Sequence, residues 1–322
     1  MKRIILSAIA LYAAVSLSAI EPTKRVLLYP EGQNVDKGIV ENGVKITEGP
    51  LESNGFTGDK ELLYDWRYQK VADGAMIDIY LPEMPNGQMM IVCPGGGYGA
   101  VCSGHEGRQV AEWALSHRIA VGVLIYRLPN HHCRVPLQDV QNAFRYCRHH
   151  ASEWGIKQIG VMGFSAGGHL AASASTLWVD ETTRPDFSVL FYPVIDFIHN
   201  GHLGTRKNLL PEDADESLVA HYSLQTQVNA QTPKTLLMLS QDDSGVKPFN
   251  SIGYFEKLLE NGVPSELHIF SSGKHGWGFG PRLMPDKNGG YHMTRDLLGE
   301  AQRADFNKIL ERWLADRRAE IK

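Results

Sequence analysis

The chain has 322 residues, of which 43% are hydrophobic and 21% are charged, and its formal net charge is −4. A chain of this length can bury a large core, and one large α/β domain fits it well. The small negative charge argues against nucleic acid or an anionic membrane surface as the main partner, so a substrate that is neutral or presented in small pieces is expected.

The first residues are typical of a secretory signal peptide. Lys2 and Arg3 form a basic start, residues 4–17 form a short apolar core, and Ala19 suits cleavage. We therefore expect residues 1–19 to be removed on export to the periplasm or the extracellular space. The apolar run is short for a bilayer span and no second candidate follows, so no membrane span is expected.

Residues 20–69 are interpreted as an N-terminal extension packed on the core, followed by a catalytic domain over residues 70–322. Four cysteines occur in that domain, and in an exported protein they allow three disulfide pairings: Cys93, Cys102, Cys133 and Cys147. Cys93 ends an apolar strand and Cys147 lies in a helical pattern, which favours buried free thiols. No pair of cysteines has the spacing of metal ligands.

Apolar runs alternate with helical patterns along the catalytic domain, which predicts a doubly wound, mostly parallel sheet in an α/β fold. A strand near 26–29 precedes the domain, and the expected strands within it are 76–81, 89–93, 120–126, 158–162, 187–192, 235–239 and 266–270. Residues 196–233 are polar, irregular and too long for a plain connection. They are predicted to form a small cap-like insertion with a short helix at 217–221.

A run of glycines follows the predicted strand 89–93, in Pro94-Gly95-Gly96-Gly97-Tyr98-Gly99. So many glycines after a buried strand indicate that the backbone itself faces a ligand, as in a loop that donates N–H groups to an oxyanion. A phosphate-binding loop is the alternative, but no Gly-Lys-Ser/Thr follows. Next, Ser103 and Glu106 have the spacing of a capping box, which leaves His105 as a surface histidine near the pocket.

Gly163-Phe164-Ser165-Ala166-Gly167 lies between an apolar run and an alanine-rich run, the pattern of a strand, a sharp turn and a helix start. In such a turn the serine hydroxyl stands clear of the sheet, and glycines flank it because a Cβ would clash with neighbouring elements. The helix start behind it offers N–H groups and positive potential to an anion. We therefore predict that Ser165 is a nucleophile; a glycine-rich turn capped by serine is the alternative.

A serine hydroxyl needs a base to take its proton, and the base needs a carboxylate to hold its tautomer. His275 follows the strand 266–270 and is flanked by glycines, so it is the predicted base. Asp242 and Asp243 follow the strand 235–239, and Asp196 follows 187–192. All lie where parallel strands end, where sites of open α/β sheets gather. Spacing alone leaves the choice between Asp242 and Asp243 open.

Together these residues resemble the α/β-hydrolase superfamily and, more narrowly, secreted bacterial carbohydrate esterases of the acetyl-xylan-esterase-like group. The resemblance covers roughly residues 70–318 and rests on Pro94-Gly95-Gly96-Gly97-Tyr98, Tyr126-Arg127-Leu128-Pro129, Gly163-Phe164-Ser165-Ala166-Gly167-Gly168-His169-Leu170, Tyr192-Pro193, Asp242-Asp243, Asn250-Ser251 and His275-Gly276-Trp277-Gly278-Phe279. It implies an α/β-hydrolase fold and ester hydrolysis.

The resemblance also implies residue roles. The family's acid stands three positions before a valine and eight before a serine, which selects Asp243 through Val246 and Ser251. Lys247 stands where valine-proline is usual, so Asp242 remains an alternative. The implied oxyanion donors are the N–H groups of Gly97 or Tyr98 and of Ala166.

The predicted activity is hydrolysis of short acyl esters, acetyl first, on plant cell-wall carbohydrate such as xylan. It would proceed through Ser165, His275 and Asp243 with no metal or organic cofactor. Tyr98, Trp277 and Phe279 are candidates for stacking on a sugar ring. A feruloyl or general short-chain carboxylesterase is the near alternative, and a non-catalytic carbohydrate-binding protein on the same fold is an alternative of another class. The sequence does not indicate an oligomeric state.

Overall fold

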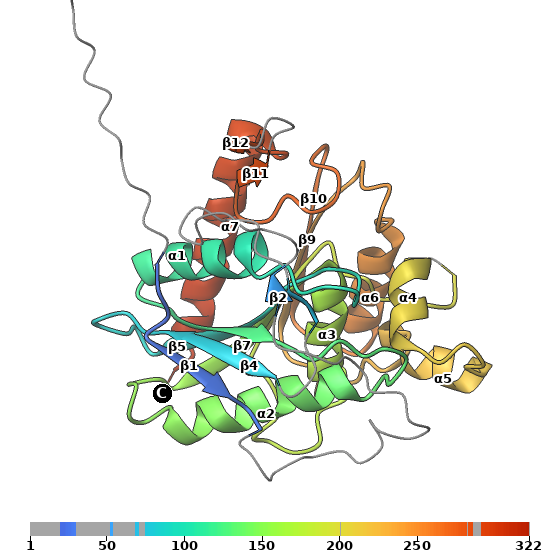
Figure 1. The fold of residues 1–322 in the computed structure, drawn as a ribbon, viewed down its shortest axis with the longest axis horizontal. Helices are drawn as coiled ribbons and strands as arrows, with labels where there is room; N and C mark the ends of the chain where they lie inside the picture. Colours follow the sequence, from blue (N-terminus) through green and yellow to red (C-terminus); the bar gives the residue numbers. More distant parts are fainter. Residues whose placement is uncertain are drawn as a thin grey trace, which may run out of the picture.

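The computed structural model describes residues 20–29, 52–53, 68–70, 75–199, 201–281, 283–285 and 291–321. An eight-stranded sheet lies at its centre, in the order β1-β4-β6-β5-β7-β8-β9-β10 (Figure 1). Its strands are β1 Lys24–Leu27, β4 Met76–Tyr80, β5 Gln88–Cys93, β6 Ala120–Ile125, β7 Gln158–Phe164, β8 Ser188–Phe191, β9 Thr235–Ser240 and β10 Ser265–Phe270. All pairings from β6 to β10 are parallel, and β4 pairs antiparallel with both β1 and β6. The predicted mostly parallel sheet is confirmed.

Helices cover both faces of this sheet (Figure 1). One core contains α2, α3 and α6, and the other contains α1 and α7. Their bounds are α1 Gln109–Ser116, α2 Val135–His150, α3 Ser165–Thr176, α6 Phe249–Glu260 and α7 Gly299–Arg318. Side chains of a strand alternate between the faces, so Ile91 enters the first core and Val92 the second. This explains why the inner strands read as unbroken apolar runs.

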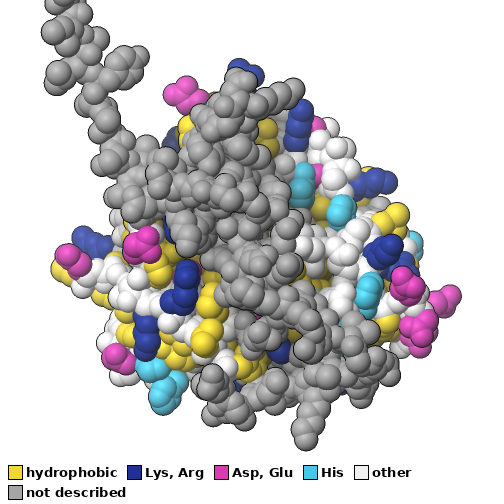
Figure 2. Space-filling view, viewed as in Figure 1, with side chains coloured by type: hydrophobic (Ala, Val, Ile, Leu, Met, Phe, Trp, Pro, Cys, Tyr) yellow, Lys and Arg dark blue, Asp and Glu magenta, His cyan; other side chains and the backbone are white. Residues whose placement is uncertain are grey.

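Two short helices, α4 Leu203–Leu209 and α5 Glu216–His221, and the 3-10 helix Leu224–Thr226 lie between β8 and β9. Two small antiparallel pairs lie outside the main sheet, β2 Glu52–Ser53 with β3 Tyr68–Lys70 and β11 Leu283–Pro285 with β12 Tyr291–Met293. Basic and acidic side chains are interspersed on the face in Figure 2.

The predicted signal peptide, residues 1–19, lies outside the described residues, as does most of the predicted extension 20–69. The described part of that extension includes β1, which adds an edge strand to the sheet. In the described ranges no helix is long and apolar enough to cross a membrane. The four cysteines are free thiols, and burial raises the pKa of Cys93 and Cys147.

A buried ion pair fixes the loop that follows β6. Arg127 Nη2 lies 2.6 Å from Asp139 Oδ1, and both side chains are almost fully buried. Asp139 also accepts hydrogen bonds from the backbone N–H of Arg127 and the hydroxyl of Tyr29. The preceding residue, Tyr126, donates its hydroxyl to the Pro94 carbonyl at 2.8 Å. The ion pair therefore steadies the start of the glycine-rich loop.

We expect Asp139→Ala to lower the free energy of unfolding by about 3–5 kcal/mol, because it leaves the Arg127 charge buried without its partner. Urea unfolding measures this loss. The matched control is Arg145→Ala, which breaks the exposed Arg145–Asp180 pair and should change stability little. Equal effects of the two substitutions would contradict the assignment.

Candidate active site

Ser165 occupies a strained turn between β7 and α3. Its φ of +53° lies in the left-handed region, which is uncommon for a residue with a side chain. The turn is tight: a Cβ on Gly163 would lie 2.2 Å from the Gly167 carbonyl oxygen, and a Cβ on Gly167 would lie 2.0 Å from that of Cys93. Both positions therefore require glycine, as the sequence pattern predicts.

Ser165, His275 and Asp243 form one hydrogen-bonded chain. The Ser165 Oγ lies 2.8 Å from His275 Nε2, and His275 Nδ1 lies 2.7 Å from Asp243 Oδ2. The carboxylate can only accept, so Nδ1 carries the proton and Nε2 is left to accept from the serine hydroxyl. The Asp243 side chain is fully buried, whereas that of His275 is 30% exposed. This arrangement can transfer the serine proton to the imidazole.

The geometry separates the three aspartates that the sequence left as candidates. Asp243 uses its second oxygen to accept from the N–H groups of Gly245 and Val246, which fixes its carboxylate. Asp242 is exposed and accepts from the Lys274 N–H at 2.8 Å, so it holds the loop that carries His275. Asp196 is buried and accepts from N–H groups of its own turn. Only Asp243 contacts the imidazole of His275.

A cavity of about 480 Å³ opens over the serine. Its walls come from the glycine-rich loop, from the loops that carry Ser165, Asp243 and His275, and from the residue that precedes α4. The lining includes Gly96, Gly97, Ser165, His202, Gly245 and His275. Asn208 of α4 donates to the Gly97 carbonyl at 2.8 Å and so fixes the loop at the cavity wall. Gly97 thus reaches the cavity, while Tyr98 and Ala166 are not among the described residues that line it. The role of all three as oxyanion donors stays a prediction.

The aromatic side chains predicted to meet a sugar lie elsewhere. Tyr98 is buried, with its hydroxyl 3.0 Å from His169 Nδ1. Trp277 is only 1% exposed and packs edge-to-face on Phe191 in the core beneath α7, and the half-buried Phe279 packs against the same core. Burial in the cores leaves neither Tyr98 nor Trp277 open to a sugar ring, and none of the three rings is among the described residues that line the cavity. A stacking role for Phe279 stays a prediction.

The predicted capping box at Ser103–Glu106 is also wrong. The segment Gly104–Arg108 forms a π-helix, and the Ser103 side chain makes no capping hydrogen bond. Glu106 is buried and accepts instead from the Gly95 N–H at 2.7 Å and the Tyr192 hydroxyl at 2.8 Å. His105, expected at the surface, is buried at the cavity with Nε2 3.4 Å from Glu106 Oε1. Tertiary contacts replace the local capping pattern here.

Glu106 joins the two loops that flank the serine. It holds the glycine-rich loop through Gly95, and it holds Tyr192, whose hydroxyl also accepts from the Gly278 N–H in the loop after His275. Burial raises the pKa of Glu106, but the charge of His105 and hydrogen bonds from His105, Tyr192 and Gly95 lower it to about 2. The carboxylate is therefore ionised at neutral pH and accepts from both loops.

Comparison with known proteins identifies the family. Residues 90–279 match the α/β hydrolase fold family over more than half of the chain. The chain belongs to the α/β hydrolase family. The acetylxylan esterase of Xylanibacter ruminicola is 38% identical over 213 residues, which are 64% of this chain and 44% of that protein. The endo-1,4-beta-xylanase B of Butyrivibrio fibrisolvens is 32% identical over 205 residues, which are 58% of this chain and 32% of that protein.

This α/β hydrolase therefore spans less than half the length of the curated relatives it matches. A solved structure agrees over nearly its whole length: the acetyl ester-xyloside bifunctional hydrolase from Caldicellulosiruptor lactoaceticus is 29% identical with a TM-score of 0.67, and the match covers 92% of this chain and 97% of that one. The resemblance to acetyl-xylan-esterase-like hydrolases, expected from the motifs, is confirmed.

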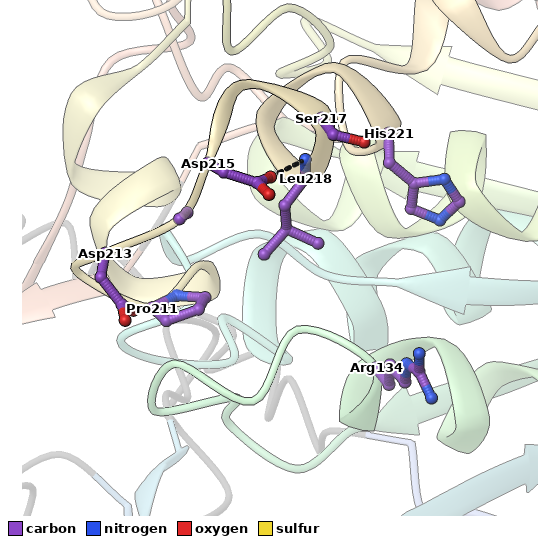
Figure 3. A pocket seen from close by; sticks show the side chains of 8 residues that line it. Arg134, Pro211, Asp213, Asp215, Ser217, Leu218 and His221 are labelled. Carbon is purple, nitrogen blue, oxygen red and sulfur yellow. Dashed lines mark hydrogen bonds between the residues drawn. The ribbon is translucent and has the colours of Figure 1, made fainter.

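The hydrolase has a second cavity, of about 570 Å³, between Arg134 and the segment around α5 (Figure 3). Asp215 lines it, but its carboxylate accepts from the Leu218 N–H at 2.7 Å and so caps α5 (Figure 3). Exposed acidic side chains gather at this corner: Glu212, Asp213, Asp215 and Glu216. None of the predicted site residues lines this cavity.

The pH dependence of stability tests the role of Glu106. Its folded pKa of about 2 lies below its ordinary value of 4.5, so ionisation stabilises the fold above pH 4.5 and this contribution disappears as the pH falls through 2. We expect the stability difference between the wild type and Glu106→Gln to be constant above about pH 5 and to shrink between pH 4.5 and 2. Urea unfolding across this range measures it.

Glu112→Gln provides the control of opposite sign. Burial raises the pKa of Glu112, although Arg108 opposes this, so the wild type should gain stability over that variant as the pH falls. A difference for Glu106→Gln that stays constant down to pH 2 would show that its carboxylate is not held ionised in the fold.

Proposed function

We propose that this chain is a serine esterase that removes short acyl groups, acetyl first, from plant cell-wall carbohydrate such as xylan. The observation that carries the proposal is the continuous hydrogen-bonded chain from Ser165 through His275 to Asp243 at the cavity. The names of the relatives support the substrate class, since one is an acetylxylan esterase and another an acetyl ester-xyloside bifunctional hydrolase. Export directed by residues 1–19 would bring the enzyme to such a polymer.

The reaction follows from this geometry in two steps. His275 Nε2 takes the proton of Ser165 as Oγ attacks the ester carbonyl carbon, and the carbonyl electrons move to the oxygen. When these electrons re-form the carbonyl, the bond from its carbon to the alcohol oxygen breaks. The alcohol leaves with the proton from His275, and the acyl group stays on Oγ. Water then attacks the acyl-enzyme, gives a proton to His275, and releases the acid as Ser165 regains its hydrogen. Asp243 stabilises the imidazolium in both steps.

Backbone N–H groups would hold the oxyanion. Ala166 lies in the first turn of α3, where backbone N–H groups have no partner within the helix and the helix dipole is positive. The glycine-rich loop lines the same cavity as Ser165, and its Gly97 or Tyr98 would be the second donor. Hydrogen bonds from Asn208 to Gly97 and from Gly95 to Glu106 keep this loop in place before substrate arrives.

The cavity lining favours a short acyl group. Small residues make up much of the lining that surrounds Ser165, including Gly96, Gly97, Ala100 and Cys102. Its only rings among the described residues are imidazoles, so it offers no aromatic wall for a feruloyl group. These features support acetyl ahead of feruloyl esters. The strained φ of Ser165 argues against a protein that only binds carbohydrate, because such strain is typical of catalytic turns.

The first experiment measures acetate release from acetylated xylo-oligosaccharides by the chain from Ile20, with Ser165→Ala in parallel. We expect the wild type to release acetate and the variant to be slower by about a millionfold in kcat, because no nucleophile remains. Cleavage of p-nitrophenyl acetate alone would retain the mechanism and contradict the carbohydrate substrate. Cleavage of neither ester would favour the carbohydrate-binding alternative.

A pair of neighbouring substitutions tests the acid. Asp243→Asn should lower kcat on p-nitrophenyl acetate by about ten-thousandfold, because the amide cannot hold the His275 tautomer. Asp242→Asn keeps an oxygen that can accept from the Lys274 N–H, so a far smaller loss is expected. Steady-state kinetics on both variants give the comparison. A larger loss for Asp242→Asn would reverse the assignment of the acid.

A further inference from the structure

His202 brings a second imidazole to the cavity from a distant part of the chain. It is the N-cap residue of α4, in the segment between β8 and β9, and it lines the same cavity as Ser165 and His275. The side chain is exposed at the mouth of the cavity rather than buried at its floor. The triad does not use it, and no sequence motif indicates it.

The capping contact fixes which nitrogen of His202 carries the proton. Nδ1 accepts a hydrogen bond from the Thr205 N–H at 3.2 Å and lies 2.9 Å from the Thr205 hydroxyl. A ring nitrogen that accepts an N–H bond carries no hydrogen, so the neutral ring is protonated at Nε2. Nδ1 is held at the start of α4 by Thr205, so Nε2–H is the group of the ring that can donate to a substrate. Thr205 is fully buried, which holds the ring in this orientation.

His202 and His275 line the same cavity, and His202 is near enough to His275 and Asp243 for their charges to affect its pKa. Partial burial lowers the pKa of His202, the neighbouring His275 lowers it further, and Asp243 raises it. The ring is therefore neutral at neutral pH, as its role as an acceptor at Nδ1 requires. In the proposed reaction His275 gives its proton to the departing alcohol, so groups beside His275 face the alcohol part of the ester.

We propose that His202 binds the sugar part of the substrate by donating a hydrogen bond from Nε2–H to an oxygen next to the ester. This inference rests on the proposed function and assigns a residue for its carbohydrate specificity. A sugar ester carries hydroxyl and ring oxygens beside the reacting bond, whereas p-nitrophenyl acetate has no such oxygen there. The contact should therefore distinguish the two kinds of ester.

His202→Asn separates this role from helix capping. Asparagine is a good N-cap residue and can still accept from the Thr205 N–H, but it is too short to reach a substrate. We expect the ratio of kcat/KM on acetylated xylo-oligosaccharides to kcat/KM on p-nitrophenyl acetate to fall by roughly three- to tenfold. His199→Asn is the matched control, because His199 is exposed in the same segment and outside the cavity. Its ratio should equal that of the wild type.

Thermal unfolding checks that the variant folds, and His202→Ser, another N-cap residue, replaces it if it does not. An unchanged ratio in the folded variant overturns the inference, and so does an equal loss on both esters, which would assign His202 to the chemistry at His275. A wild type that cleaves only p-nitrophenyl acetate overturns the carbohydrate role. A wild type that cleaves neither ester overturns the proposed function itself.

Discussion

The tight turn at Ser165 constrains the rest of the site. Its left-handed backbone depends on Gly163 and Gly167, because a Cβ at either position would clash with a backbone carbonyl oxygen. The turn is also closed from the other side, since the Ser165 carbonyl accepts from the Val194 N–H at 3.0 Å. These contacts fix the backbone from which the serine hydroxyl projects toward His275.

Parallel strands supply those loops at one edge of the sheet. The glycine-rich loop follows β5, Asp243 follows β9 and His275 follows β10, so residues far apart in sequence meet where the strands end. Strand order alone does not fix distances between loops. Glu106 helps to fix the distance between two of these loops, because its buried carboxylate joins the glycine-rich loop to the loop after His275 through Tyr192.

Sequence patterns predict the features of the site that depend on local structure. They do not predict the side-chain orientations that depend on tertiary packing. Ser165 and His275 are found because each needs a particular residue in a loop after a strand, whereas Asp242 and Asp243 differ only in which side chain turns inward. The same ambiguity misplaces Trp277, since a loop sequence does not reveal which side of the loop faces the core. The capping pattern at Glu106 is overridden by partners that lie distant in the chain. His202 has no local signal beyond its position at a helix start.

The short helix α4 connects the two sides of the cavity. Asn208 near its end holds the Gly97 carbonyl, and His202 at its start reaches the cavity mouth beside His275. The segment is further tied to the core because the His131 N–H donates to the Asn208 carbonyl at 3.0 Å. A segment held in this way forms a fixed wall of the site. In the role proposed for His202, a change at the start of α4 alters recognition of the alcohol part of an ester while Ser165, His275 and Asp243 keep their hydrogen bonds.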